Sequence, residues 1–178
     1  YDRLVGSEMC IRDSIKKAKK YIKAGDIFQV VPSQRFETNF KNKGSSLYKV
    51  LRLTNPSPFM YYFNLPNFQI VGSSPEILVR LRSDLITLRP IAGTRPRGKN
   101  IKQDRKYELD LLSDEKETSE HLMLLDLGRN DVGKVAKKST VSVTAKFIIE
   151  KYSHVMHLVS NVTGKLKKNI STIEALMA

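Results

Sequence analysis

The sequence predicts an α+β fold built around a large, mostly antiparallel sheet. Short strand-like runs stand on both sides of one long helical pattern, whereas a doubly wound sheet alternates strands with helices. Several of these runs come in pairs separated by two or three turn residues, as in β-hairpins. With 40% hydrophobic and 28% charged residues, the 178-residue chain can build a packed core. No apolar run approaches the ~20 residues that a membrane-spanning helix needs.

The first elements along the chain are expected to be a short basic helix and a strand. Residues 1–14 show no clean period, so we expect a non-native end there and exclude it from the fold. Ser14 is the predicted N-cap of a helix over 14–24, and Gly25 is the predicted C′ residue that ends it. Residues 26–36 are rich in β-branched and aromatic side chains and are expected to form a strand.

The middle of the chain predicts one helix and two hairpins. A short helix over 46–53 ends before the breaker Asn55-Pro56-Ser57-Pro58. The strands of the two hairpins are 59–64 with 68–73, and 77–82 with 85–89.

The second half predicts a loop, a long helix and a return to strands. The loop covers 91–100, and the helix runs from 104 to about 135. Strands over 141–143, 147–150 and 154–165 precede a final helix capped by Ser171. The leucines expected to face the core from the long helix are Leu109, Leu112, Leu122, Leu125 and Leu127.

The net charge of +13 raises the possibility of a nucleic-acid partner. The lysines are scattered in small clusters, and neither a zinc-finger spacing nor an aromatic RNA-binding signature accompanies them, so solvated surface lysines are expected instead. A basic, strand-rich nucleic-acid-binding module stays open as an alternative, which salt-dependent binding to DNA or RNA would reveal. The single cysteine excludes an internal disulfide framework. Since no secretory signal is visible, a cytoplasmic location is expected, with no membrane partner.

The segment from Asp114 to His121 is the sharpest acidic feature. Glu117 and Glu120 are three residues apart on the predicted helix, and Glu117 and His121 are four apart, so they share a face. Such a face can hold a hard cation or perform acid–base chemistry. An exposed acidic helix face is the more common explanation of this spacing, and both stay open.

The run from Gly93 to Asn100 nearly spells a nucleotide-binding P-loop. Asn100 stands where the magnesium-binding Ser or Thr is needed, and Pro96 removes a backbone N–H, so we reject that function. Gly93 and Thr94 still offer free backbone and a hydroxyl to an anion such as a carboxylate. His154 and His157 are expected to point to opposite faces of a strand, where a hydrogen-bonded core histidine is the ordinary case.

Taken in order, these stretches resemble the chorismate-utilising enzyme family. The matching runs are 25–36, 55–62, 71–76, 91–98, 114–121, 126–131 and 152–164. The resemblance implies an α/β sandwich of large, mostly antiparallel sheets with helices. It also implies a carbon–oxygen lyase that converts chorismate and ammonia to anthranilate and pyruvate with Mg²⁺, the first committed step of tryptophan biosynthesis. A glutamine amidotransferase subunit would supply the ammonia.

The resemblance also implies roles for single residues. It makes Glu117 the acid that helps the ring hydroxyl leave, and His157 the group that serves pyruvate elimination. Gly93 and Thr94 would bind substrate, and Glu120 would bind Mg²⁺. The residues matching a feedback site for L-tryptophan are Pro58, Phe59 and Met60.

Two positions separate branches of the family. Aminodeoxychorismate synthases, the alternative branch, carry a nucleophilic Lys at the position of Ala92, and isochorismate and salicylate synthases carry a water-activating Lys at the position of Gln29. Both residues here favour attack by ammonia. The resemblance further implies that residues 15–178 are the N-terminal two-thirds of a catalytic domain, which would be inactive alone because later family motifs are missing.

Overall fold

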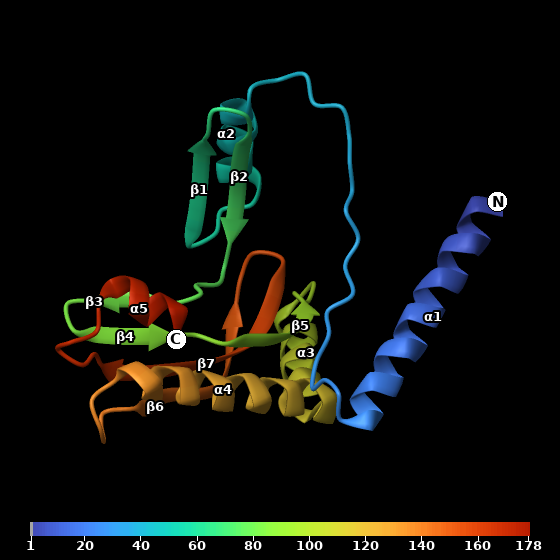
Figure 1. The fold of residues 1–178 in the computed structure, drawn as a ribbon. Coiled ribbons are helices and arrows are strands. Elements are labelled where there is room, and N and C mark those ends of the chain that lie inside the picture. The colour runs from blue at the N-terminus through green and yellow to red at the C-terminus, as the bar shows by residue number, and fades with distance from the viewer. Residues whose placement is uncertain (1) are drawn as a thin grey trace. The chain divides into compact units, whose positions relative to one another are not determined.

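The computed structural model describes residues 2–178, with side chains from Cys10 onward, and it confirms the α+β fold (Figure 1). The chain divides into two compact units, residues 1–41 and residues 42–178, which are described separately. None of the helices between residues 2 and 178 is long and apolar enough to cross a membrane.

The first unit contains one helix, α1 (Asp2–Ala24). The helix begins well before the predicted N-cap Ser14, which therefore lies inside the helix and does not cap it. Inside a helix the backbone groups on both sides of a residue already have helical hydrogen-bond partners. Gly25 ends it as predicted, with φ +80°. The N–H of Gly25 donates to the Ile22 carbonyl at 3.2 Å and that of Asp26 to the Tyr21 carbonyl at 3.0 Å, a Schellman pattern.

Two predictions for this unit have different outcomes. The strand expected over 26–36 is wrong, since Phe28 and Phe36 are 91% and 86% exposed and no strand among residues 2–178 pairs with this run. Strand propensity alone does not make a strand, because a strand needs a neighbouring strand to form a ladder with, so the run stays irregular. A non-native end over 1–14 remains a prediction; residue 1 lies outside the described residues, and the others belong to α1.

The second unit opens with a small two-stranded sheet and the predicted helix. Helix α2 (Gly44–Thr54) is followed by β1 (Phe59–Asn64) and β2 (Gln69–Ser74), which pair antiparallel. A Cβ at Gly72 would lie 2.1 Å from the Tyr61 ring, so only glycine leaves room for that ring across the hairpin. The Ser73 hydroxyl donates to the Asn55 carbonyl at 2.8 Å and ties β2 to the chain before β1.

The main sheet is assembled on β7 (Val155–Lys165). Strands β4 (Leu85–Leu88) and β5 (Ile91–Pro96) pair with successive parts of one edge of β7, and β6 (Ser142–Lys151) pairs with the other. Strand β3 (Arg80–Arg82) pairs with β4, and all pairings are antiparallel. The loop predicted over 91–100 is therefore half wrong, because β7 offers residues 91–96 a ladder that their Gly and Pro content did not suggest.

Two helices replace the single long one that the pattern predicts. They are α3 (Ile101–Ser113) and α4 (Glu115–Val135), separated at Asp114. The Asp114 side chain accepts hydrogen bonds from the backbone N–H groups of Lys116 and Glu117, so this residue starts a new helix as its N-cap. The final helix, α5 (Thr172–Met177), has the predicted Ser171 cap within a full capping box.

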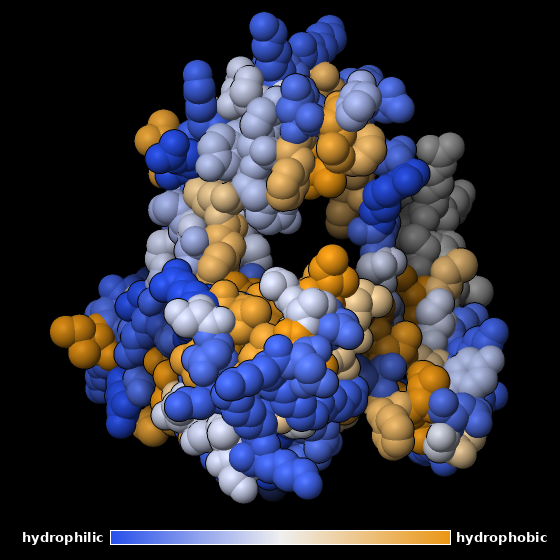
Figure 2. All heavy atoms as spheres, turned by 60° about the vertical axis from the view of Figure 1, so that its left-hand side comes forward, coloured by the Kyte–Doolittle hydropathy of each residue, from blue (hydrophilic) through white to orange (hydrophobic). Residues whose placement is uncertain are grey.

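Helix α4 packs on the sheet through a stripe of buried residues, and not all of them are hydrophobic. Its buried residues are His121, Leu125, Gly128, Val132 and Val135, at helical spacing. Of the five leucines predicted for the core only Leu125 is buried, because a histidine and a glycine occupy stripe positions. The other four are exposed, and Figure 2 shows apolar side chains reaching the surface between hydrophilic ones.

An ion pair connects α3 to the chain directly after β5. The Arg97 guanidinium donates to both oxygens of Asp104, at 2.9 and 3.0 Å, and the Gly98 N–H donates to the same carboxylate at 2.8 Å. Asp104 is only 8% exposed. The hydrogen bonds from Arg97 first, and then from Gly98, hold the pKa of Asp104 far below its ordinary value of 3.8.

We predict that Asp104→Asn flattens the acid side of the stability profile. A lowered pKa in the folded state means that the carboxylate stabilises the fold fully above the ordinary pKa of 3.8 and progressively less as the pH falls below it. Urea unfolding at several pH values should therefore show a weaker loss of stability on acidification in Asp104→Asn. The control Asp126→Asn, in an exposed pair with Arg129, should keep the parental slope; equal slopes for all three proteins would contradict this account.

Candidate active site

A β-bulge in β5 is the centre of the site. Ala92 pairs with Leu158 and Thr94 pairs with His157, so Gly93 is an extra residue without a partner in the ladder. Its φ of +69° lies in the left-handed region that glycine adopts without strain, as in bulges that begin with glycine. The extra residue turns the Thr94 side chain and the Gly93 carbonyl toward His157.

The same glycine lets β5 approach the first turn of α4. A Cβ at Gly93 would lie 2.8 Å from Leu111 Cδ1 and 3.2 Å from Glu117 Oε2. Any side chain at this position would push Glu117 or Leu111 away. The predicted substrate-binding residue Gly93 and the predicted acid Glu117 are thus brought together by the absence of a side chain.

Asp114 and Arg95 fix the position of Glu117. Asp114 Oδ1 accepts from the N–H groups of Lys116 at 3.0 Å and Glu117 at 3.1 Å, while its Oδ2 accepts from Arg95 Nη2 at 2.8 Å. The hydrogen bond from the Glu117 backbone and then that from Arg95 lower the pKa of Asp114. Because Arg95 follows Thr94 in β5, one carboxylate couples the helix start to the bulge.

His157 lies beside the bulge with one nitrogen occupied. Its Nδ1 is 3.2 Å from the Gly93 carbonyl oxygen and 3.0 Å from Thr94 Oγ1. A carbonyl can only accept, so we assign the proton to Nδ1, which leaves the lone pair on Nε2. His157 is half-buried and hydrogen-bonded, as expected. His154 lies before β7 and is exposed, so the two histidines are not on opposite faces of one strand.

Glu76 is a candidate that the residue-by-residue reading missed. It follows β2, and its N–H donates to Ser74 Oγ at 3.2 Å. Partial burial raises the pKa of Glu76, against the opposing effects of a hydrogen bond from the Ile91 backbone and of nearby His157. The signal in the sequence was the Ser-Ser-Pro-Glu turn directly after a predicted strand.

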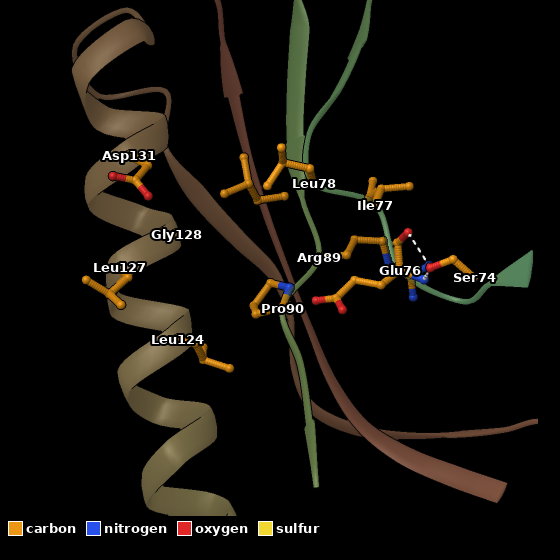
Figure 3. Close-up of a pocket in the computed structure, with 11 residues that line it drawn as sticks. Ser74, Glu76, Ile77, Leu78, Arg89, Pro90, Leu124, Leu127, Gly128 and Asp131 are labelled. Atoms are coloured by element: carbon orange, nitrogen blue, oxygen red, sulfur yellow. Dashed lines mark hydrogen bonds between the residues drawn. The ribbon is translucent and has the colours of Figure 1, made fainter. Parts of the chain in front are cut away.

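A pocket of about 500 Å³ opens beside Glu76, between α4 and the chain from the end of β4 to Pro90. Figure 3 shows the Glu76 side chain reaching from the chain after β2 toward Pro90. On the opposite wall stand Leu124, Leu127 and Gly128 of α4. This volume suits a small organic ligand, with a carboxyl at its rim and apolar walls.

Glu120 and His121 do not share a site. His121 is fully buried against the sheet, its Nε2 lies 2.7 Å from Ser160 Oγ, and burial lowers its pKa. Glu120 is half-buried one position earlier on the helix. Within the described part of the chain, no three or more His, Cys, Asp or Glu side chains gather closely enough to hold a metal ion. Glu120, the residue predicted to bind a metal ion, is therefore a single carboxylate outside any such cluster.

The residues matched to a tryptophan site lie in the small sheet. Pro58 precedes β1, and Phe59 and Met60 begin it, both half-buried and paired with Ser74 and Ser73 of β2. Ser74, the partner of Phe59, is only two residues before Glu76, whose carboxyl lies at the pocket.

Comparisons with known proteins agree on one family. A model of the family described as chorismate binding enzyme matches residues 10–178. Anthranilate synthase component 1 of Cereibacter sphaeroides is 62% identical over 165 residues, 93% of this chain and 33% of that protein. The Pseudomonas aeruginosa protein of the same name is 57% identical over 166 residues, 93% of this chain and 34% of that protein. The chain thus spans about a third of the length of these relatives.

Solved structures show the same likeness. Anthranilate synthase component I of Streptococcus pneumoniae superposes with a TM-score of 0.81 at 40% identity, covering 90% of this chain and 35% of that one. The menaquinone-specific isochorismate synthase of Escherichia coli, at 23% identity and a TM-score of 0.54 over 61% of this chain and 24% of its own, shares the fold. The expected fold class is confirmed.

We predict that Gly93→Ala damages the site more than its small size suggests. The substitution combines a left-handed φ with a Cβ pressed on Leu111 and Glu117, so unfolding free energy should fall by about 1–3 kcal/mol. Gly133→Ala is the matched control, because Gly133 lies on the exposed face of α4 and an added Cβ would have no neighbouring atom within 4 Å, so the free energy of unfolding should rise by about 0.5–1 kcal/mol. Chemical denaturation of both variants measures the difference; a neutral Gly93→Ala would mean that the bulge is not constrained.

Proposed function

The chain belongs to the family of chorismate binding enzymes, and from this premise we propose that it is part of an anthranilate synthase component 1, which forms anthranilate and pyruvate from chorismate and ammonia. Because the chain spans about a third of its relatives, this activity is proposed for the protein that contains it. The observation that carries the proposal is the bulge site, where Gly93, Thr94, Glu117 and His157 meet.

The choice of ammonia as nucleophile follows from two side chains. Ala92 stands in β5 opposite Leu158 and has no amine, so it cannot serve as the covalent nucleophile of the aminodeoxychorismate synthases. Gln29 has no basic nitrogen with which to activate water. Both side chains support attack by a nucleophile that enters from outside, namely ammonia.

Binding of the substrate would use groups that the bulge leaves open. The Nδ1–H of His157 has the Gly93 carbonyl as acceptor, so the exposed Thr94 hydroxyl can donate to a carboxylate. Chorismate is a dianion, and the basic chain would attract it.

The proposed chemistry needs an acid first and a base afterwards. Hydroxide is a poor leaving group, so an acid must protonate the ring hydroxyl while ammonia attacks. The resemblance assigns this acid to Glu117, and the raised pKa of Glu76 makes that residue a second candidate. The free Nε2 of His157 would then take a ring proton while the bond from the ring to the enolpyruvyl oxygen breaks and the ring becomes aromatic. Return of that proton to the methylene carbon of the released enolpyruvate would give pyruvate.

Magnesium is proposed at Glu120. Mg²⁺ keeps several waters and is usually held by one or two carboxylates plus the substrate, so a single half-buried carboxylate fits it as one protein ligand. When bound, the ion would supply positive charge for a substrate carboxylate. Glu120 would hold the ion, and the capped start of α4 would hold Glu120.

Further parts of the proposal concern partners. A glutamine amidotransferase subunit would deliver the ammonia, as the word component in the relatives' names suggests. Pro58, Phe59 and Met60 would contribute to a feedback site for L-tryptophan, because a rigid turn, an aromatic ring and a flexible apolar side chain suit an indole. The cytoplasm is the proposed location.

We predict that variants of the proposed acid and of the proposed base stop the reaction at two different steps. In the enzyme that contains this chain, Glu117→Gln should leave chorismate unconverted, with turnover about 10²–10⁴-fold lower, because the resemblance makes Glu117 the acid for the leaving hydroxyl. His157→Met should allow amination and accumulate an aminated, pyruvate-bearing intermediate visible by chromatography. If Glu76→Gln stalls at chorismate while Glu117→Gln turns over, the acid is Glu76 instead. Normal anthranilate formation by His157→Met would overturn the role of His157.

A second prediction concerns Glu120. Glu120→Gln keeps the shape but removes the charge that binds a hard cation, so half-saturation by Mg²⁺ should require about tenfold more ion or beyond. Calorimetric Mg²⁺ titration and the Mg²⁺ dependence of turnover both measure this. Glu115→Gln, at an exposed position five residues earlier in α4, is the control and should titrate like the parent. An unchanged titration for Glu120→Gln would remove it from the metal site.

A further inference from the structure

A carboxylate lies directly beside His157 and does not pair with it. Strand β7 places His157 opposite Thr94 on β5 and opposite Glu150 on β6. Cross-strand neighbours on one face have Cβ atoms about 4.5–5.5 Å apart, within reach of an ion pair. Thr94 contacts the imidazole at 3.0 Å, whereas the hydrogen bonds of Glu150 go elsewhere.

Both oxygens of Glu150 are occupied by other groups. Arg89, between β4 and β5, donates from Nη2 to Oε1, and the Tyr152 hydroxyl donates to Oε2 at 2.9 Å. The side chains of Arg89 and Glu150 are each 29% exposed, so this is a partly desolvated pair. We call Arg89, Glu150 and Tyr152 the carboxylate clamp.

Tyr152 is itself held in place. Its N–H donates to the Val155 carbonyl at 2.8 Å, and its own carbonyl accepts from Arg97 Nη1 at 2.6 Å. Its ring stands edge-on to the His157 ring, with centroids 5.6 Å apart. Burial first, and the Glu150 carboxylate second, raise the pKa of Tyr152, so the hydroxyl stays a donor. Tyr152 therefore touches the imidazole while it restrains the neighbouring carboxylate.

Release of Glu150 would change the chemistry of His157. Nδ1 is already a donor to the Gly93 carbonyl, so a carboxylate could bind the ring only through a protonated Nε2. The ring would then be an imidazolium locked in an ion pair, and Nε2 would have no lone pair with which to take a proton.

We propose that Arg89 and Tyr152 are positioning residues that hold Glu150 away from His157, so that Nε2 stays unprotonated and free to act as a base. This inference rests on the proposed function in so far as it makes His157 the base of pyruvate elimination. The carboxylate clamp acts on the base only through Glu150. The other titratable or charged groups around His157 are Glu76 after β2, Glu117 behind Gly93, Arg95 on β5 and His154 before β7; they stay the same in every variant below.

The test uses Arg89→Met and Tyr152→Phe, each with and without Glu150→Gln, in the enzyme that contains this chain. The first readout is the type of Nε2 signal of His157 in ¹⁵N-histidine-labelled enzyme at one neutral pH, assigned by its loss in His157→Gln. The parent should show an unprotonated nitrogen and Arg89→Met a protonated one. Glu150→Gln alone should resemble the parent, and in the double variant it should restore the unprotonated signal. Tyr152→Phe should shift the signal in the same direction as Arg89→Met.

The second readout is the ratio of aminated intermediate to anthranilate. Elimination should slow about 10–100-fold in Arg89→Met while amination continues, and Glu150→Gln should restore it. A merely structural role would slow both steps, and Glu150→Gln would not rescue it. An unchanged nitrogen signal in folded Arg89→Met, or a change that persists with Glu150→Gln, would overturn the proposal.

If Arg89→Met does not fold, the same outcomes measured in Tyr152→Phe decide between the proposal and its rejection. A parent that shows the expected signals but makes no anthranilate would contradict the proposed function and leave the clamp intact.

Discussion

The rest of the structure depends on the burial of β7. A strand buried this deeply must pair its backbone N–H and C=O groups on both edges, since unpaired polar groups inside a protein cost free energy. Strands β4 and β5 satisfy one edge and β6 satisfies the other. This demand brings three strands into register with β7, and the pairings of β5 and β6 place Thr94 and Glu150 opposite His157.

Helix α4 can approach the sheet closely because glycines of β7 and β5 stand at the points of contact. A Cβ at Gly164 would lie 2.7 Å from Val132 and 2.8 Å from Ala136, so the helix packs on bare backbone there. Gly93 plays the same part at the helix start, where Glu117 comes against the strand. Since Asp114 both caps α4 and binds Arg95, the packing of the helix and the geometry of the site are one arrangement.

Three of the chain's many basic residues form ion pairs with carboxylates near the site. Arg89, Arg95 and Arg97 each donate to carboxylates of other elements, namely Glu150, Asp110 with Asp114, and Asp104. These arginines therefore join β5 and the residues on either side of it to α3, to the start of α4 and to β6. Charged hydrogen bonds of this kind are directional, so they hold a bulged strand in one conformation where apolar contacts alone would let it slide.

The sequence by itself determined the features that depend on neighbouring residues. The stop at Gly25, the capping box at Ser171 and the hairpins of β1–β2 and β3–β4 need only local turn and cap chemistry, and all were predictable. The family motifs also identified the site residues Gly93, Thr94 and His157, which the structure places in contact.

Only the tertiary structure decided the rest, because a partner far along the chain was required. Residues 91–96 became a strand and 26–36 did not, since β7 offers a ladder to the first and no described strand offers one to the second. The buried stripe of α4 includes a histidine and a glycine whose burial depends on Ser160 and on Leu88 across the sheet. Glu76 and Glu150 gained their importance in the same way, because burial and register alone set a carboxyl beside His157 and decide whether it pairs with the ring.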